Sequence, residues 1–212
     1  MDIIQIAGFL GCGKTTLMLK ITGMISEKYG YRVAMVVNEL GSVPVDGKVV
    51  EESGMMLKEI GSGCICCEVA QTFANTVALL SLDFKPDVLL VEPTGVAIPR
   101  QVKLVAKMGG RSTKVVVGPA VVLFDSSRPD ELMDEELMGL LVKSQLRDAD
   151  IVVISKVDMV DRAQIEKCKE MIIEAIPKLR KAQFVEVSAI NGTGVNEVID
   201  AIGSFLKEES SG

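Results

Sequence analysis

Short hydrophobic segments alternate with longer amphipathic segments along most of the chain. The short segments are continuous runs of Val, Ile and Leu, which is typical of strands buried on both faces of a parallel sheet. The longer segments repeat their apolar residues with helical spacing. The pattern therefore predicts strands at 3–7, 32–37, 87–91, 114–124, 151–155 and 184–187, and helices at 14–28, 66–81, 99–108, 131–144, 162–176 and 195–206.

This order of elements predicts an α/β fold with a mostly parallel central sheet in three layers. We expect residues 1–207 to form a single domain and residues 208–212 to form a polar, frayed tail. Residues 38–63 are rich in Gly, Glu and Val, and we expect a loop with short extended pieces there. Gly118 and Pro119 are expected to bend or divide the strand that contains them.

Composition changes this picture by excluding several kinds of chemistry. The 212 residues include 23 basic and 29 acidic side chains, a net charge of −6, which argues against a general nucleic-acid binder. The absence of histidine excludes Ser-His-Asp triads, histidine general bases and histidine-ligated metals. Chemistry must therefore use backbone amides, Lys, Thr, carboxylates or thiols.

The five cysteines are odd in number and three of them lie within four positions, which does not suit a disulfide framework. We see no signal-peptide pattern at the first residues. The longest apolar run, 115–124, is interrupted and too short to cross a bilayer. We therefore expect a cytoplasmic protein without a membrane partner.

Residues 8–15 read Gly-Phe-Leu-Gly-Cys-Gly-Lys-Thr, which fits the phosphate-binding P-loop pattern. A strand is predicted before this segment and a helix after it, as such a loop requires. Its amides and the helix N-terminus attract phosphate, Lys14 is expected to reach the β- and γ-phosphates, and the Thr15 hydroxyl to ligate Mg²⁺. The predicted nucleotide-binding residues here are Gly8, Gly11, Cys12, Gly13, Lys14, Thr15 and Thr16.

The nucleotide base is indicated by Ser155, Lys156 and Asp158, which follow a predicted strand. The guanine-recognition signature is Asn or Thr, then Lys-x-Asp, in which the carboxylate accepts from the guanine N1–H and amine. Ser155 departs from the usual first residue. Ser188 and Ala189 follow the next strand and fit a second base-contacting loop, so GTP is favoured over ATP.

A carboxylate ends the strand at 87–91 and is followed by Pro-Thr-Gly. Glu92 is predicted to hold Mg²⁺, through water, and Gly95 to bring a backbone amide to the γ-phosphate. A solvated strand-end acid is the alternative for Glu92. Asp125 also ends a strand, and a helix or turn cap is the interpretation we favour for it.

The segment Gly-Cys-Ile-Cys-Cys at 63–67 places three thiols within four residues at a predicted loop-to-helix junction. Cys64, Cys66 and Cys67 can converge on one thiophilic ion, Zn²⁺, Cu⁺, Co²⁺ or Ni²⁺, and leave a fourth position open. Buried apolar cysteines and a redox relay are the alternatives. For Cys168, on a predicted helix, we favour a buried apolar role.

Taken together, these motifs resemble the CobW family of P-loop GTPases, which are relatives of the nickel-insertion GTPases of urease and hydrogenase maturation. The matching segments are the P-loop at 8–16, Asn-Glu-Leu-Gly at 38–41 with Asp46, the thiol signature at 63–67, Glu-Pro-Thr-Gly at 92–95, Gln145, Ala-Asp at 149–150, and 155–158. The thiol signature is the specific part.

The resemblance implies GTP hydrolysis coupled to delivery of a metal, or of a metal cofactor, to a client metalloprotein. It implies that Lys14, Glu39, Asp46 and Glu92 carry catalysis, that Glu39 contributes to the thiol metal site, and that GTP, GDP, Mg²⁺ and Zn²⁺ or a similar metal are bound. A nucleotide-dependent homodimer is a further family-level expectation. The alternative is a GTP-dependent assembly switch, for example for a corrinoid enzyme, that carries no free metal.

Four departures from the family pattern stand out, and the lost acid, the absent histidines and the expected lack of a C-terminal domain favour that alternative. Ser42 replaces the family's usual acid after Asn-Glu-x-Gly, and Ser62 replaces its usual Asn before the thiols. The family's histidine-rich stretch has no counterpart in a chain without histidine, and we expect no separate C-terminal domain after position 206. A small-molecule kinase that uses ATP is a third reading, against which residues 155–158 speak.

Overall fold

The computed structural model describes residues 1–37, 56–59, 67–110, 115–136 and 138–210. They contain a seven-stranded sheet in the order β3-β2-β4-β1-β5-β6-β7, in which every neighbouring pair is parallel. The strands are β1 (Asp2–Gly8), β2 (Val33–Val37), β3 (Met56–Glu59), β4 (Val88–Glu92), β5 (Val116–Asp125), β6 (Ile151–Ser155) and β7 (Gln183–Val187). The predicted α/β fold with a parallel sheet is confirmed.

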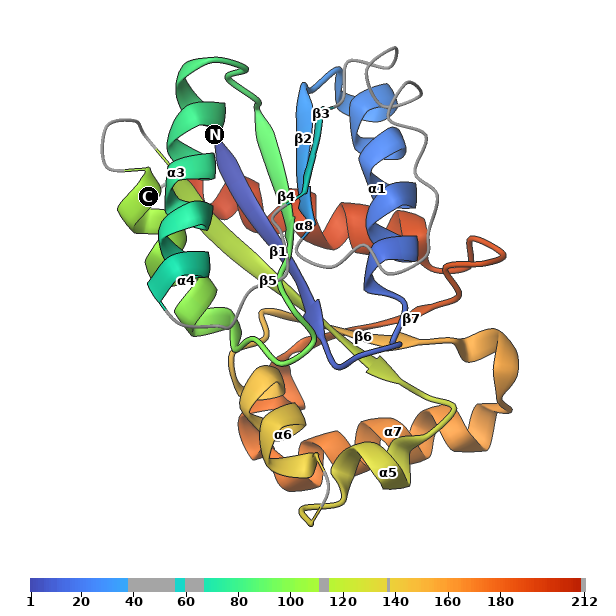
Figure 1. Cartoon of the computed structure of the whole chain (residues 1–212). Coiled ribbons are helices and arrows are strands. Elements are labelled where there is room, and N and C mark those ends of the chain that lie inside the picture. The colour runs from blue at the N-terminus through green and yellow to red at the C-terminus, as the bar shows by residue number, and fades with distance from the viewer. Residues whose placement is uncertain (38–55, 60–66, 111–114, 137, 211–212) are drawn as a thin grey trace.

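Helices cover both faces of the sheet (Figure 1). They are α1 (Lys14–Tyr29), α3 (Cys67–Leu82), α4 (Pro99–Gly109), α5 (Pro129–Met133), α6 (Gly139–Arg147), α7 (Arg162–Ala175) and α8 (Val195–Ser210), with short 3-10 turns η1 (Val157–Met159) and η2 (Pro177–Lys181).

Successive side chains of β1 pack against helices on opposite faces of the sheet. Ile4 and Ile6 point to one face and pack in a cluster with α1 and α8. Ile3 and Ala7 point to the other face, where they belong to two separate clusters. Ile3 packs with α3 and α4, and Ala7 packs with α5, α6 and α7. Gln5 lies between these two residues on the same face, where the apolar core is interrupted.

Two predicted elements differ from the structure. The helix predicted over 131–144 is divided into α5 and α6, because the Asp134 carboxylate accepts a hydrogen bond from the Glu136 N–H at 2.9 Å and so stabilises a turn. Gly139 begins α6 where an added Cβ would lie 2.6 Å from the Met133 carbonyl oxygen. Helix α8 continues to Ser210, beyond the predicted end at 206.

Strand β5 is bent rather than divided at Gly118 and Pro119. It runs unbroken over ten residues. Its pairing with β1 shifts by one residue there, since Ile3 pairs with Val117 and Gln5 pairs with Ala120. The extra residue is a β-bulge, which lets the strand pass the proline and continue to Asp125.

The sheet brings the predicted motifs to one edge. β1 lies between β4 and β5. The carboxyl ends of the strands, or the positions just after them, hold the P-loop, Glu92, Asp125, Ser155 and Ser188. Ligands of open parallel sheets bind at this edge. The fold therefore collects segments that are far apart in the sequence around one place.

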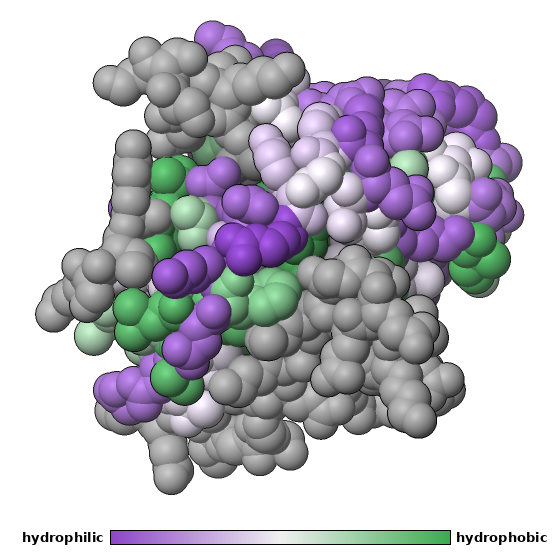
Figure 2. All heavy atoms as spheres, turned by 90° about the horizontal axis from the view of Figure 1, so that it is seen from above, coloured by the Kyte–Doolittle hydropathy of each residue, from purple (hydrophilic) through white to green (hydrophobic). Residues whose placement is uncertain are grey.

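Hydrophobic residues reach the surface between hydrophilic ones on the face seen from above in Figure 2. Within the described ranges, no helix combines the length and the apolar character that crossing a lipid bilayer demands.

Candidate functional site

The P-loop connects β1 to α1 in a conformation that needs its glycines. Gly8 has φ of 134°, and an added Cβ there would lie 2.6 Å from the Leu123 carbonyl oxygen. Gly13 caps α1 in the left-handed region with φ of 93°, and no heavy atom of the described residues beyond its chain neighbours lies within 4 Å of where its Cβ would be. A loop with open space at its helix N-terminus suits the approach of phosphate.

Lys14, Thr15 and Glu92 meet at the mouth of this loop. Lys14 is buried, its ammonium donates to the Phe9 carbonyl at 3.3 Å, and it lies 3.9 Å from Glu92 Oε1. The Thr15 hydroxyl donates to the same Glu92 oxygen at 2.9 Å. A hydroxyl and a carboxylate oxygen are the hard ligands that Mg²⁺ prefers, so this pair fits the ion assigned to it from sequence. Thr16 is exposed on the first turn of α1.

Gly95 lies directly against the P-loop. A Cβ at Gly95 would come within 2.9 Å of the Leu10 backbone nitrogen, so only glycine fits this approach. The Gln145 side chain on α6 is buried and its amide donates to the carbonyls of Gly95 at 3.0 Å and Ala97 at 2.9 Å. Gln145 thereby fixes the loop after β4, a role that its sequence context did not indicate.

The two predicted base loops lie at the ends of β6 and β7. Ser155 is buried and its hydroxyl donates to the Phe124 carbonyl at 3.2 Å, so it fastens β6 to β5. Asp158 is exposed on η1.

In the second loop, Ser188 is fully buried and its oxygen accepts from the Asn191 N–H at 3.3 Å. Ala189 is half-buried, and the neighbouring Ile190 carbonyl accepts from Lys20 of α1 at 3.0 Å. The second base loop is thereby tied to the helix that follows the P-loop.

Asp125 connects the first base loop, at residues 155–158, to the P-loop. It is fully buried, and its Oδ2 lies 2.7 Å from Lys156 Nζ and 3.1 Å from Arg128 Nε. Its Oδ1 accepts from the backbone and hydroxyl of Ser127, the turn cap expected from sequence. Arg128 in turn donates to the Leu10 carbonyl in the P-loop and packs over the Phe9 ring. Arg128 belongs to no recognised sequence motif, so its role could not be predicted.

The surroundings of Asp125 favour its charged form. Burial raises the pKa of the carboxyl, but hydrogen bonds from Lys156 and Ser127 outweigh burial and leave the pKa below its ordinary value. Lys156, whose ammonium lies 2.7 Å from the Asp125 carboxylate, has a left-handed backbone conformation with φ of 60°. A strained backbone at a lysine is retained where the side chain has a fixed partner.

Cys12 and Cys168 are not reactive thiols. Cys12 and Cys168 are fully buried, and burial raises the pKa of each to about 11. Cys12 therefore serves the P-loop through its backbone and packing, and Cys168 packs in the core, as predicted.

The predicted thiol site falls largely outside the described residues. Cys64, Cys66, Glu39 and Asp46 lie outside them, and Cys67 is described only as the first residue of α3. Among the described residues, no group of three Cys, Asp or Glu side chains is arranged to hold a metal ion. The predicted ligand set stays a prediction.

Asp125→Asn should lower the free energy of unfolding by about 2 kcal/mol at pH 7, because a neutral amide holds Lys156 and Arg128 less strongly. The wild-type advantage should shrink below about pH 4, since an Asp with a lowered folded-state pKa stabilises above its unfolded value of about 3.9 and loses that contribution as the pH falls. Urea unfolding at both pH values measures the difference.

Asp83→Asn is the matched control for this change. Asp83 is exposed, and its substitution should alter the free energy of unfolding by less than about 0.5 kcal/mol. Equal stability of the Asp125 variant and the wild type at pH 7 would contradict the role given to Asp125.

Comparison with known proteins identifies the family. Residues 2–183 match the family model described as CobW/HypB/UreG, nucleotide-binding domain. The zinc chaperone YeiR of Escherichia coli is 35% identical over 160 residues, which are 72% of this chain and 45% of that protein. The zinc chaperone CobW of Sinorhizobium sp is 28% identical over 226 residues, 92% of this chain and 63% of that protein. The chain thus spans between 45% and 63% of the length of these two relatives.

Solved structures share the fold. The hydrogenase maturation factor HypB from Archaeoglobus fulgidus has a TM-score of 0.70 at 21% identity, covering 97% of this chain and 90% of that one. The Zn(II)-bound YjiA GTPase of E. coli has a TM-score of 0.59 at 24% identity, covering 82% and 54%. The site geometry and the match over 2–183 lead to one conclusion: the chain belongs to the CobW/HypB/UreG family of nucleotide-binding domains.

Proposed function

We propose that this chain binds and hydrolyses GTP and couples its nucleotide state to delivery of a thiophilic metal, Zn, Co or Ni, or of a metal cofactor, into a client metalloprotein. The observation that carries the proposal is that the P-loop, Glu92 and residues 155–158 lie at one edge of the sheet. Thr15 bonds to Glu92, and Asp125 contacts both Lys156 and Arg128. The relatives named zinc chaperones support the metal part.

The phosphates are bound by the amides of residues 8–16 and by the Lys14 ammonium. Thr15 and Glu92 would hold Mg²⁺, which when bound neutralises charge on the β- and γ-phosphates. Gly95, whose approach to Leu10 excludes a side chain, presents the backbone amide after β4 to the γ-phosphate. Positioning and charge neutralisation are sufficient for this hydrolysis, so no histidine is required.

Guanine is recognised by Asp158 and by the loop of Ser188 and Ala189. The Lys156 stem packs along the base plane while its ammonium is held by Asp125. Met159 and Ile190 are 63% and 77% exposed on the two base loops and offer apolar surface to the base.

Coupling to the metal is supported by strand register. Val37, the last residue of β2, pairs with Glu92 on one side and with Glu59 on the other. The chain therefore leaves β2 beside the predicted Mg²⁺ ligand and reaches Glu39 two residues later. A change at the γ-phosphate would thus act close to the ends of β2 and β3. The segment with Glu39 and Asp46 follows β2, and the segment with the three thiols follows β3.

The second candidate is a GTP-dependent assembly switch that carries no free metal. Ser42 and the absence of histidine favour it, because each removes a possible metal ligand. In both readings the partners are a guanine nucleotide, a client metalloprotein and, in one nucleotide state, a second copy of the chain, all in the cytoplasm.

Guanine nucleotides should bind at least about a hundredfold more tightly than adenine nucleotides, because adenine lacks the paired donors that the Asp158 carboxylate accepts. Asp158→Ala should weaken GDP binding by about the same factor and leave ADP binding unchanged. Fluorescent-nucleotide titration measures both, with Asp83→Ala as the control. Equal affinities for GDP and ADP in the wild type would refute the base assignment.

Cys66→Ser should weaken Zn²⁺ or Co²⁺ binding by about tenfold or more, because it removes one of three thiolate ligands. Competition with a chromophoric chelator under reducing conditions gives the affinity. Cys168→Ser is the matched control, since that thiol is buried with a pKa of about 11. Unchanged metal affinity in the Cys66 variant would favour the assembly switch.

A further inference from the structure

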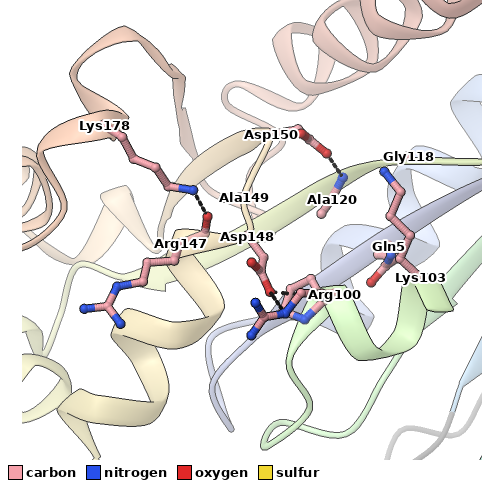
Figure 3. A pocket seen from close by; sticks show the side chains of 11 residues that line it. Gln5, Arg100, Lys103, Gly118, Ala120, Arg147, Asp148, Ala149, Asp150 and Lys178 are labelled. Carbon is pink, nitrogen blue, oxygen red and sulfur yellow. Dashed lines mark hydrogen bonds and ion pairs between the residues drawn. The ribbon is translucent and has the colours of Figure 1, made fainter. Parts of the chain in front are cut away.

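A cavity of about 310 Å³ opens between α4 and the end of α6, away from the P-loop (Figure 3). Its floor is formed by β1 and β5 and its walls by α4, by the connection from α6 to β6, and by η2. It lies where the apolar core on this face is interrupted between Ile3 and Ala7. The residues that carry its chemistry are Gln5, Arg100, Lys103, Arg147, Asp148 and Lys178.

The lining is positive although the protein as a whole carries −6. Four basic side chains face two carboxylates; both carboxylates accept from backbone N–H groups, and Asp148 also lies 4.0 Å from the Arg100 Nε. Asp150 accepts from the Ala120 N–H at 2.8 Å, and Asp148 accepts from the Arg100 N–H at 3.1 Å. In the described part of the chain, the side chains of Lys103 and Arg147 have no ion-pair partner. Positive charge at this cavity is therefore left uncompensated.

Gln5 at the floor is an unusual residue for its position. It is 1% exposed in the central strand, where its neighbours Ile3, Ile4, Ile6 and Ala7 are apolar. Its Oε1 has no hydrogen-bond partner among the described residues, which costs about 1–3 kcal/mol. The terminal torsion of glutamine is soft, so either end of the amide can turn towards the cavity. The amide is therefore available to a ligand in the cavity that it lines.

We propose that this cavity binds a small polyanion whose phosphate or carboxylate groups contact Arg100, Lys103 and Arg147 and whose remaining polar atoms meet Gln5. Donors from α4 and from the end of α6 line one recess of limited volume, which suits a small molecule. Arginine guanidinium groups bind either kind of oxyanion through paired hydrogen bonds. The proposal stands independently of nucleotide binding at the opposite edge of the sheet.

Titration of inorganic phosphate and of citrate into the full chain, at constant ionic strength and without nucleotide, tests the site. The backbone amide signals of Gly118, Ala120 and Ala149 report on it by NMR, because these residues line the cavity and not the P-loop. We expect their shifts to saturate with at least one probe. Saturation by phosphate alone or by citrate alone assigns the ligand to that class, and saturation by neither overturns the proposal.

Two substitutions separate a built site from general charge attraction. Arg147→Ala should weaken binding of the saturating probe about tenfold. Arg180 is an exposed arginine outside the cavity, so Arg180→Ala should leave this binding unchanged. Gln5→Leu should weaken binding while the midpoint of thermal unfolding stays equal or rises, since it removes an unpaired buried amide. Equal weakening by the two arginine variants, or unaltered binding in both Arg147→Ala and Gln5→Leu, would overturn the proposal.

Discussion

The Asp125 carboxylate is the interaction on which the arrangement of this site depends. A charged group that is fully buried must be paired and hydrogen-bonded, or its desolvation would destabilise the fold by several kcal/mol. Asp125 meets that requirement with Lys156 from the base loop and Arg128 beside the P-loop. Because Arg128 also donates to Leu10, the two segments that would hold the base and the phosphates share one anchor.

The remaining parts of the site are held in a similar way by contacts between distant segments. Gln145 of α6 holds the carbonyls of Gly95 and Ala97, Thr15 of α1 bonds to Glu92 of β4, and Lys20 bonds to the carbonyl of Ile190. Each contact joins a helix to the last residue of a strand or to the loop that follows a strand. The parallel sheet supplies the edge, and these side chains set the spacing between the loops along it.

Local patterns were sufficient to predict six of the seven strands, while β3 was expected only as a short extended piece within the loop at 38–63. Continuous apolar runs gave the strands, and the segment at 8–15 was recognised because its glycines and lysine have fixed spacing. The roles of Arg128 and Gln145 could not be predicted, because each depends on a partner at least 48 residues away in the sequence. The break between α5 and α6 was missed because the side chain of Asp134 competes with helical hydrogen bonding, which periodicity does not reveal.

The proposed function requires that the nucleotide state changes the affinity for metal. It joins a described site at the edge of the sheet to the thiols at 64–67, whose signature is the most specific part of the sequence. The most direct measurement is the zinc dissociation constant of the full chain without nucleotide, with GDP and with a non-hydrolysable GTP analogue. A difference of about a hundredfold between the GDP and GTP-analogue states corresponds to about 2.7 kcal/mol of coupling, and a difference of this order is the expected result. The same dissociation constant in all three states would contradict the proposed function.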